Sequence, residues 1–199
     1  MNDPLKKDDF TLASEQWQRY VYCRDRGHKD FIKQAKKCED MYLGGGKQWS
    51  EEDRKQCEEV QGRKCVEVNT IFTTINTVMG EQIQTRADIN FRPRAGEATQ
   101  DIADTLTKLA MQVASDNKYE WLESEVWADG IIQQRGYFDI RMDFDDQLKG
   151  DIRISVVDPL EVLPDPDAQS YDPKHWKDVI VTKWMSLDEI PQVYGKELS

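Results

Sequence analysis

YFDIRMDF, at residues 137–144, decides the fold class together with DIRISV at residues 151–156. In both stretches apolar and polar residues alternate, and a period of two is typical of a β-strand that buries one face. The residues between them end in Lys149-Gly150 and supply a turn, so the two stretches predict an antiparallel hairpin. We expect the face that carries Phe138, Ile140 and Met142 to be the buried one.

Upstream of this hairpin the apolar residues recur three or four positions apart, which indicates amphipathic helices. One broken helix or two helices are predicted from about residue 12 to residue 42, with the interruption near Gly27. Ser50, which acidic residues follow, predicts the capped start of a short helix. Three longer helices are predicted from about residue 69 to residue 135, and Asn69 is the expected cap of the first.

Downstream of the hairpin the chain is rich in turn residues. The Asp-Pro steps at Asp158 and Asp165 predict a loop, and residues 179–184 predict a further strand. Pro191 suits the first turn of a last helix. The chain is therefore predicted to be an α+β protein, with N-terminal helices, three longer helices and then a small antiparallel sheet.

Glycine content and charge divide the chain. The run Gly44-Gly45-Gly46 separates an expected N-terminal helical segment, residues 1–43, from an expected α+β domain, residues 44–199, which we expect to be incomplete at its C-terminus. The formal net charge is −11, to which residues 1–66 contribute +1 (14 basic, 13 acidic) and residues 67–199 contribute −12 (13 basic, 25 acidic). Such an acidic chain disfavours tight wrapping of DNA, which needs many cationic contacts to phosphate.

One stretch, from Arg24 to Lys37, is locally basic. Two interpretations of it stay open. It could meet phosphate or an acidic neighbour, or it could be a solvated helix face in which acidic and basic residues pair.

The composition also bears on the class of protein. The 6 Trp, 7 Tyr and 6 Phe are too many for a disordered acidic chain. Neither a run of roughly 18–20 apolar residues nor an apolar N-terminal signal segment is present, so neither membrane insertion nor secretion is expected. The spacing of the four cysteines is not that of a zinc site, and we expect free thiols rather than disulfides. They are Cys23, Cys38, Cys57 and Cys65.

Three patterns invite a ligand-binding interpretation. Residues 44–47 lack the second glycine and the Lys-Ser/Thr pair of a phosphate loop, so a flexible hinge before Trp49 is favoured. The acidic residues between positions 158 and 172 lack the glycine and glutamate of a calcium-binding loop, so turns are favoured there. Asp139, Asp143 and Asp145 share one strand face and could hold Mg²⁺ for phosphodiester hydrolysis, although a solvent-exposed strand shows the same alternation.

Nucleophilic catalysis has little support in the sequence. His28 lies in a charged helical region, His175 lies in a loop, and no Gly-x-Ser-x-Gly motif is present. We therefore expect no enzyme activity, no cofactor and no metal. The six tryptophans are spread along the chain, which is typical of core and interface anchors rather than of a base-stacking platform.

The order of several sequence blocks between residues 44 and 195 resembles the portal proteins of short-tailed bacteriophages. The blocks are, in chain order, Gly46-Lys47-Gln48-Trp49 with Arg54; Asn69-Thr70-Ile71; Gly80-Glu81-Gln82 with Arg86, Ile89 and Pro93; Gly136; the steps Asp158-Pro159 and Asp165-Pro166; and Lys183-Trp184-Met185-Ser186. From these blocks we take four residues as expected subunit-interface or core anchors, namely Trp49, Arg54, Arg86 and Trp184.

The resemblance implies a structural virion protein that is assembled in the host cytoplasm. It implies a ring, of twelve subunits in the full-length protein, at one capsid vertex, where terminase packages DNA and from which DNA is ejected. Its implied partners are terminase, capsid proteins and tail or head-completion proteins, and DNA passes through without sequence-specific binding. The chain then corresponds to an N-terminal portion, mostly the peripheral wing-like region. A metal-dependent phosphodiesterase and a soluble adaptor or interaction domain are the alternatives.

Overall fold

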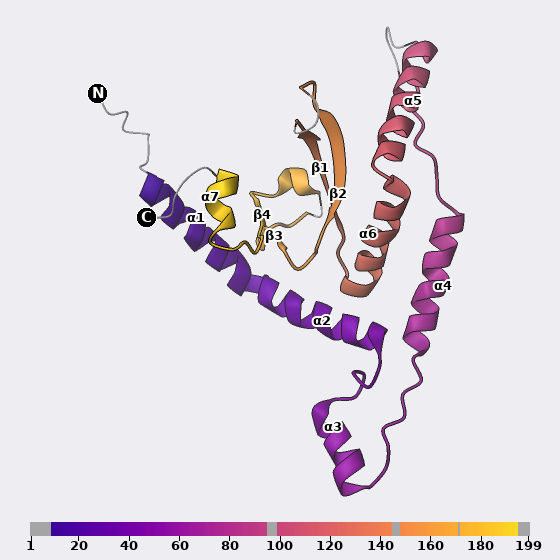
Figure 1. Ribbon diagram of the computed structural model, residues 1–199, viewed down its shortest axis with the longest axis vertical. Coiled ribbons are helices and arrows are strands. Elements are labelled where there is room, and N and C mark those ends of the chain that lie inside the picture. Colours follow the sequence, from indigo (N-terminus) through magenta and orange to yellow (C-terminus); the bar gives the residue numbers. More distant parts are fainter. Residues whose placement is uncertain (1–8, 95–98, 145–147, 171, 195–199) are drawn as a thin grey trace. The chain divides into compact units, whose positions relative to one another are not determined.

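The computed structural model describes residues 9–94, 99–144, 148–170 and 172–194 (Figure 1). Its contacts divide the chain into two compact units, one made of Met1–Ile32 with Leu160–Ser199 and the other of Lys33–Pro159. The boundary between the units falls inside a helix, α2 (Lys29–Leu43). The domain boundary expected at Gly44 stays a prediction, because compactness alone does not show which part folds independently.

The first unit combines N-terminal helices with a short C-terminal sheet. Between α1 (Asp9–Cys23) and α2 lies a π-helical turn, η1 (Arg24–His28), in which Gly27 leaves the helical conformation. The interruption predicted near Gly27 is confirmed. The buried side chains of this unit, among the residues that the structure describes, are Cys23, His28, Phe31, Val162 and Leu163.

Two short strands complete this unit. β3 (Val162–Pro164) pairs antiparallel with β4 (Val179–Val181), and Leu163 lies opposite Ile180. Arg19 on α1 forms ion pairs of 2.8 Å with Asp165 and with Asp178, which lie just beyond the ends of these strands. A 3-10 turn, η3 (Pro173–His175), joins the strands, and α7 (Glu189–Tyr194) contains Pro191 as expected.

The sequence analysis did not predict β3. A turn-rich loop was expected there, because the strand has only three residues and ends in a proline. The later strand was expected to reach Trp184, whereas β4 ends at Val181. The α+β class is confirmed, but the strands form two separate two-stranded sheets rather than one.

The helices predicted for the second unit are confirmed. They are α3 (Glu51–Lys55), which continues into a π-helical turn, η2 (Gln56–Val60), followed by α4 (Thr70–Gln84), α5 (Gln100–Asp116) and α6 (Tyr119–Gln133). The Ser50 hydroxyl accepts a hydrogen bond of 3.0 Å from the Asp53 amide, and the Asn69 side-chain oxygen accepts one of 3.0 Å from the Phe72 amide. Both predicted N-caps are therefore present.

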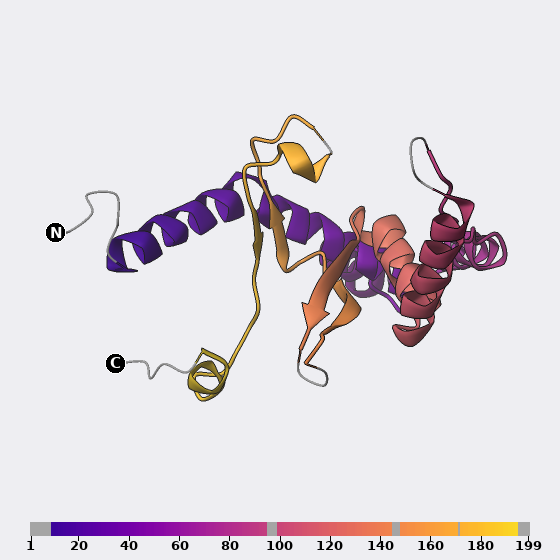
Figure 2. The same ribbon diagram turned by 90° about the horizontal axis from the view of Figure 1, so that it is seen from above.

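The predicted hairpin is formed by β1 (Tyr137–Asp143) and β2 (Asp151–Val157). Its register sets apolar residues opposite one another, Phe138 with Val156, Ile140 with Ile154 and Met142 with Ile152. The hairpin lies beside α6, and Figure 2 shows the same arrangement from above. The Tyr119 ring at the start of α6 stacks on Phe138, with 5.6 Å between the ring centroids.

The expectation that this apolar face is buried is wrong for its outer part. Ile140 is 65 % exposed and Met142 is 50 % exposed, whereas the α6 contact lies at the Phe138 end of the face. In the whole second unit the buried apolar side chains, within the described residues, are small, namely Ala35, Ala103 and Pro159. The period of two is present, but the side chains that it directs to one face are not covered by the described part of the unit.

Candidate interface sites

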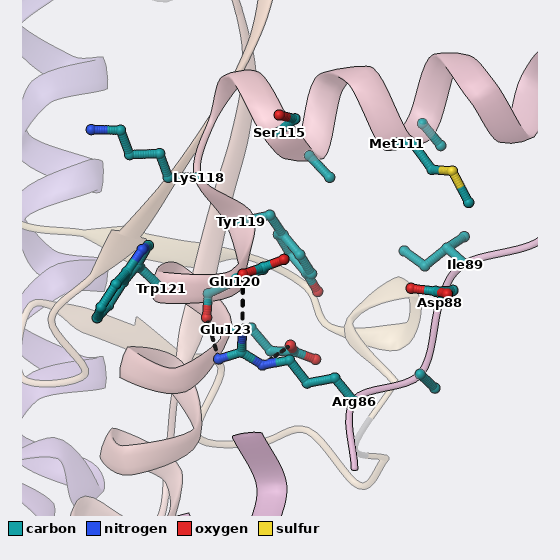
Figure 3. A pocket seen from close by; sticks show the side chains of 13 residues that line it. Arg86, Asp88, Ile89, Met111, Ser115, Lys118, Tyr119, Glu120, Trp121 and Glu123 are labelled. Atoms are coloured by element: carbon teal, nitrogen blue, oxygen red, sulfur yellow. Dashed lines mark hydrogen bonds and ion pairs between the residues drawn. The ribbon is translucent and has the colours of Figure 1, made fainter. Parts of the chain in front are cut away.

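Arg86, which follows α4, attaches the end of that helix to α6 (Figure 3). Its guanidinium donates a hydrogen bond of 2.7 Å to the carbonyl oxygen of Glu120 and a second one to the hydroxyl of Ser124. It also forms ion pairs with the carboxylates of Glu123, at 3.3 Å, and of Glu120, at 3.5 Å. These contacts hold the end of α4 against α6 within one unit, and the expected role of Arg86 as a subunit-interface or core anchor stays a prediction.

The Arg86 contacts border an open cavity of about 460 Å³. Its wall is apolar at Ile89, Met111 and Trp121, and Figure 3 shows the carboxylates of Asp88 and Glu120 on its border. Trp121 itself is 76 % exposed. The border also carries the cations of Arg86 and Lys118, so the recess combines an apolar wall with charges of both signs, which suits a side chain of a protein partner.

Replacement of Arg86 by Met is expected to lower the free energy of unfolding by about 1.5 kcal/mol, because a charged donor of two hydrogen bonds is lost. Urea denaturation followed by circular dichroism measures this change. The matched control is Arg92→Met at an exposed position, which we expect to change the free energy by less than about 0.5 kcal/mol. Equal effects of the two substitutions would contradict an anchoring role of Arg86.

The triple glycine forms a closed turn rather than the flexible hinge that the sequence predicted. Gly44, Gly45 and Gly46 all have positive φ, of 66°, 71° and 88°. The Gly46 amide donates a hydrogen bond of 2.6 Å to the carboxylate of Glu67, and the Arg54 guanidinium donates one to the Gly46 carbonyl. An amide that a phosphate loop would offer to an anion is thus already bound to a carboxylate, which explains why a nucleotide does not suit this loop.

Two acidic residues of the hairpin lie beside arginines. Asp143 lies 2.6 Å from Arg153, and Asp139 lies 3.8 Å from Arg141. Asp145, the third residue of the magnesium hypothesis, lies outside the described residues. Within the described part of the chain, no group of three or more His, Cys, Asp or Glu residues could hold a metal ion. The described residues therefore give the phosphodiesterase hypothesis no support.

A cluster of carboxylates around Asp129 in the second unit was not predicted from the sequence. Burial of Asp129 on α6 raises its pKa to about 6, and the negative charges of Glu125, Asp158 and Glu39 add to this effect. The four residues come from α2, α6 and the segment after β2, so no local motif reveals them. Only the packing of these segments brings the charges together.

Replacement of Asp129 by Asn is expected to raise the free energy of unfolding at pH 7 by about 1 kcal/mol, after allowance for solvent screening of the half-buried carboxyl. Since the folded pKa of about 6 lies above the ordinary value of 3.8 for an aspartate, the wild-type loses this stability as the pH rises from about 4 to above 6. Urea denaturation at pH 4 and pH 7 measures both effects, with Asp88→Asn as an exposed control. If the difference in the free energy of unfolding between variant and wild-type is the same at both pH values, the raised pKa of Asp129 is contradicted.

Three of the four expected anchors lie in the second unit and the fourth lies in the first. Trp49 is half-buried, Arg54 is exposed apart from its bond to Gly46, and Arg86 is held by α6, all in the second unit. Trp184 lies in the first unit and is 95 % exposed. Trp184 is thus no core anchor in the chain by itself, and the interface role of all four residues stays a prediction.

The model of the P22-like phage portal protein family matches residues 17–199 of the chain. The chain belongs to the P22-like phage portal protein family. The resemblance drawn from the sequence blocks is thereby confirmed, and with it the assignment to a bacteriophage structural protein found in virions. Comparison with individual curated proteins gives no match. No helix in the described ranges is both long enough and apolar enough to cross a membrane.

The structure explains one of the glycines in the portal-like blocks. A Cβ atom at Gly136 would overlap the backbone carbonyl of Val126, so this position joins α6 to β1 at a distance that only glycine permits. At Gly80, within α4, a Cβ atom would meet nothing within 4 Å. Packing therefore requires a glycine at position 136 of this portal protein. Packing among the described residues gives no reason for the glycine at position 80.

The basic stretch from Arg24 to Lys37 is partly neutralised by its own acidic residues. Asp25 lies 3.0 Å from Arg24 and 2.7 Å from Lys29, and these hydrogen-bonded cations lower its pKa to about 2. This favours the interpretation as a solvated helix face over that of a phosphate-binding surface.

Proposed function

We propose that the chain builds the peripheral wing-like region of a ring-shaped portal at one capsid vertex. The ring, of twelve subunits in the full-length protein, is the conduit through which terminase packages the genome and from which DNA is ejected. Capsid proteins and tail or head-completion proteins are its further partners. The subunits assemble in the host cytoplasm before they enter the virion. The family membership of residues 17–199 supports this proposal.

The observation that carries the proposal is the uncovered apolar surface of both units. In the second unit Ile140 and Met142 are at least half exposed, although the hairpin pattern directs them to one face. In the first unit Trp184 and Leu187 are 95 % and 74 % exposed. A contiguous apolar surface is rarely left in water by a monomer, and in a ring a neighbouring subunit would bury these side chains through a heterologous interface.

The charge of the chain agrees with a conduit. A formal net charge of −11 gives little non-specific affinity for the phosphate backbone, so DNA that passes through the ring is not held by many cationic contacts. Sequence-specific recognition of DNA is not expected, since the arginines with the most extensive contacts bind groups of the chain itself. Arg19 and Arg86 are both bound to carboxylates.

Replacement of Trp184 by Ala in the full-length portal protein is expected to weaken subunit association by about 2 kcal/mol per interface, the typical effect of removing a tryptophan hot spot. Because the side chain is 95 % exposed, folding of the subunit is expected to persist. Sedimentation velocity measures the fraction of protein in the ring, and circular dichroism reports folding. The neighbouring Lys183→Ala is the control and is expected to leave the ring intact; an unchanged ring fraction in the Trp184 variant would contradict the interface role.

A further inference from the structure

A tight turn after α3 brings Cys57 and Cys65 together. Cys57 lies in the π-helical turn η2, and Cys65 lies eight residues later in the irregular segment that leads to α4. The Arg63 amide donates a hydrogen bond of 2.9 Å to the carbonyl of Cys57, and Gly62 adopts a φ of 63° between them. The chain thus reverses beside η2 between the two half-buried cysteines, and the Cys57 sulfur lies near enough to Cys65 to contribute to the raised pKa of that thiol.

We propose that Cys57 and Cys65 form a reversible disulfide, which makes this turn a redox-sensitive modification site. The oxidant is a small disulfide such as oxidised glutathione. The thiolate of one cysteine attacks it, forms a mixed disulfide and releases one small thiol; the thiolate of the second cysteine then attacks the protein sulfur and releases the other. Both cysteine sulfurs are oxidised, the small disulfide is reduced to two thiols, and these take up the two cysteine protons.

The surroundings of the pair decide how the reaction proceeds. Partial burial, and the neighbouring Cys57 sulfur, raise the pKa of Cys65. This thiol is therefore protonated at neutral pH, and exchange is expected to be slow there and faster in mildly alkaline solution. The other two cysteines provide internal references, since Cys23 is buried in the first unit and Cys38 on α2 accepts a hydrogen bond of 3.6 Å from Gln34.

The disulfide would restrain a segment that is already closed at its base. Glu67 holds Gly46 and the Asn69 side chain donates a hydrogen bond of 2.8 Å to the Tyr42 carbonyl, so the chain returns at residues 67–69 to the point where it left α2. Beyond this base Val60 and Val66 are 80 % and 74 % exposed. Oxidation would limit the freedom of this apolar loop without moving its base.

The test is equilibration of the whole chain with mixtures of reduced and oxidised glutathione at mildly alkaline pH, followed by alkylation, trypsin digestion and mass spectrometry. Trypsin places the two cysteines in separate peptides, residues 56–63 and 65–86, so a disulfide between them links two peptides. The equilibrium constant for this link is expected to be about tenfold larger, or more, for the folded chain than in concentrated urea, because the folded turn has already oriented the sulfurs.

Single substitutions separate the pair from the other thiols. Cys57→Ser and Cys65→Ser should each abolish the linked peptides, while Cys38→Ser should leave them, and circular dichroism should show the same helix content for all three. In the oxidised wild-type, trypsin cleavage after Arg63 is expected to slow. The proposal is overturned if the equilibrium constant for the linked peptides is the same with and without concentrated urea. It is also overturned if Cys57 and Cys65 each carry a single glutathione, or if they form disulfide-linked dimers of the chain.

Discussion

Replacement of Leu163 by Ala is expected to lower the free energy of unfolding by about 3 kcal/mol, which is within the range measured when a buried leucine is truncated. Leu163 on β3 is 2 % exposed and is among the largest fully buried side chains of the described chain. Truncation leaves a cavity at a fully buried position of the first unit, or forces the short β3–β4 sheet to collapse onto it. Few other buried side chains in this unit are available to compensate.

The measurement is urea denaturation of wild-type and variant, followed by tryptophan fluorescence. The matched control is Leu12→Ala on α1, where the side chain is 49 % exposed and alanine is a good helix former. That control is expected to change the free energy by less than about 0.5 kcal/mol. A loss below about 1 kcal/mol for the Leu163 variant would show that β3 does not lie at the centre of the first unit.

Replacement of Gly136 by Ala is expected to lower the free energy of unfolding by about 2 kcal/mol, a typical result of overpacking. The new methyl group would overlap the backbone carbonyl of Val126 in α6, and a backbone atom cannot move aside as a flexible side chain can. Either β1 separates from α6 or α6 distorts around Val126. Thermal denaturation followed by circular dichroism measures the loss.

A neighbouring glycine gives the control. Gly130 lies inside α6, where a Cβ atom would meet nothing within 4 Å. Gly130→Ala is therefore expected to raise the free energy of unfolding by up to about 1 kcal/mol, since alanine favours the helix and restricts the unfolded chain. The two glycine-to-alanine substitutions are thus expected to change the free energy of unfolding in opposite directions. A change in the same direction for both would contradict the packing of α6 against β1.

The local features of the fold were predictable from the sequence. The N-caps at Ser50 and Asn69, the interruption at Gly27 and the alternation within each strand of the hairpin all depend on residues within a few positions of one another. Their signals are therefore present in short windows.

Features that depend on distant residues were not predictable. The contacts of Arg19 with Asp165 and Asp178 span 146 and 159 positions, and β3 is held by its pairing with β4 rather than by its own three residues. The raised pKa of Asp129 has burial as its main cause, and charges from three separate segments add to it. Such clusters have no pattern in a single sequence, because only the tertiary fold creates them.

The candidate interface residues, too, were predictable in part from the sequence. Arg86 and Gly136 were found through the order of the portal-like blocks, and the structure gives each of them a physical role within the chain. The alternation in the hairpin indicated the correct face but not its exposure, because periodicity shows which side chains share a face and not what covers that face. For Ile140, no described part of its own unit buries the side chain, which is 65 % exposed.

Electron microscopy of the purified full-length portal protein tests the central claim most directly. The account predicts closed rings, of twelve subunits, with a central channel, and predicts that the β1–β2 hairpin and Trp184 lie at contacts between neighbouring subunits. A protein that stays monomeric at every concentration, with the hairpin face and Trp184 still in solvent, would contradict it and would instead support a soluble adaptor domain.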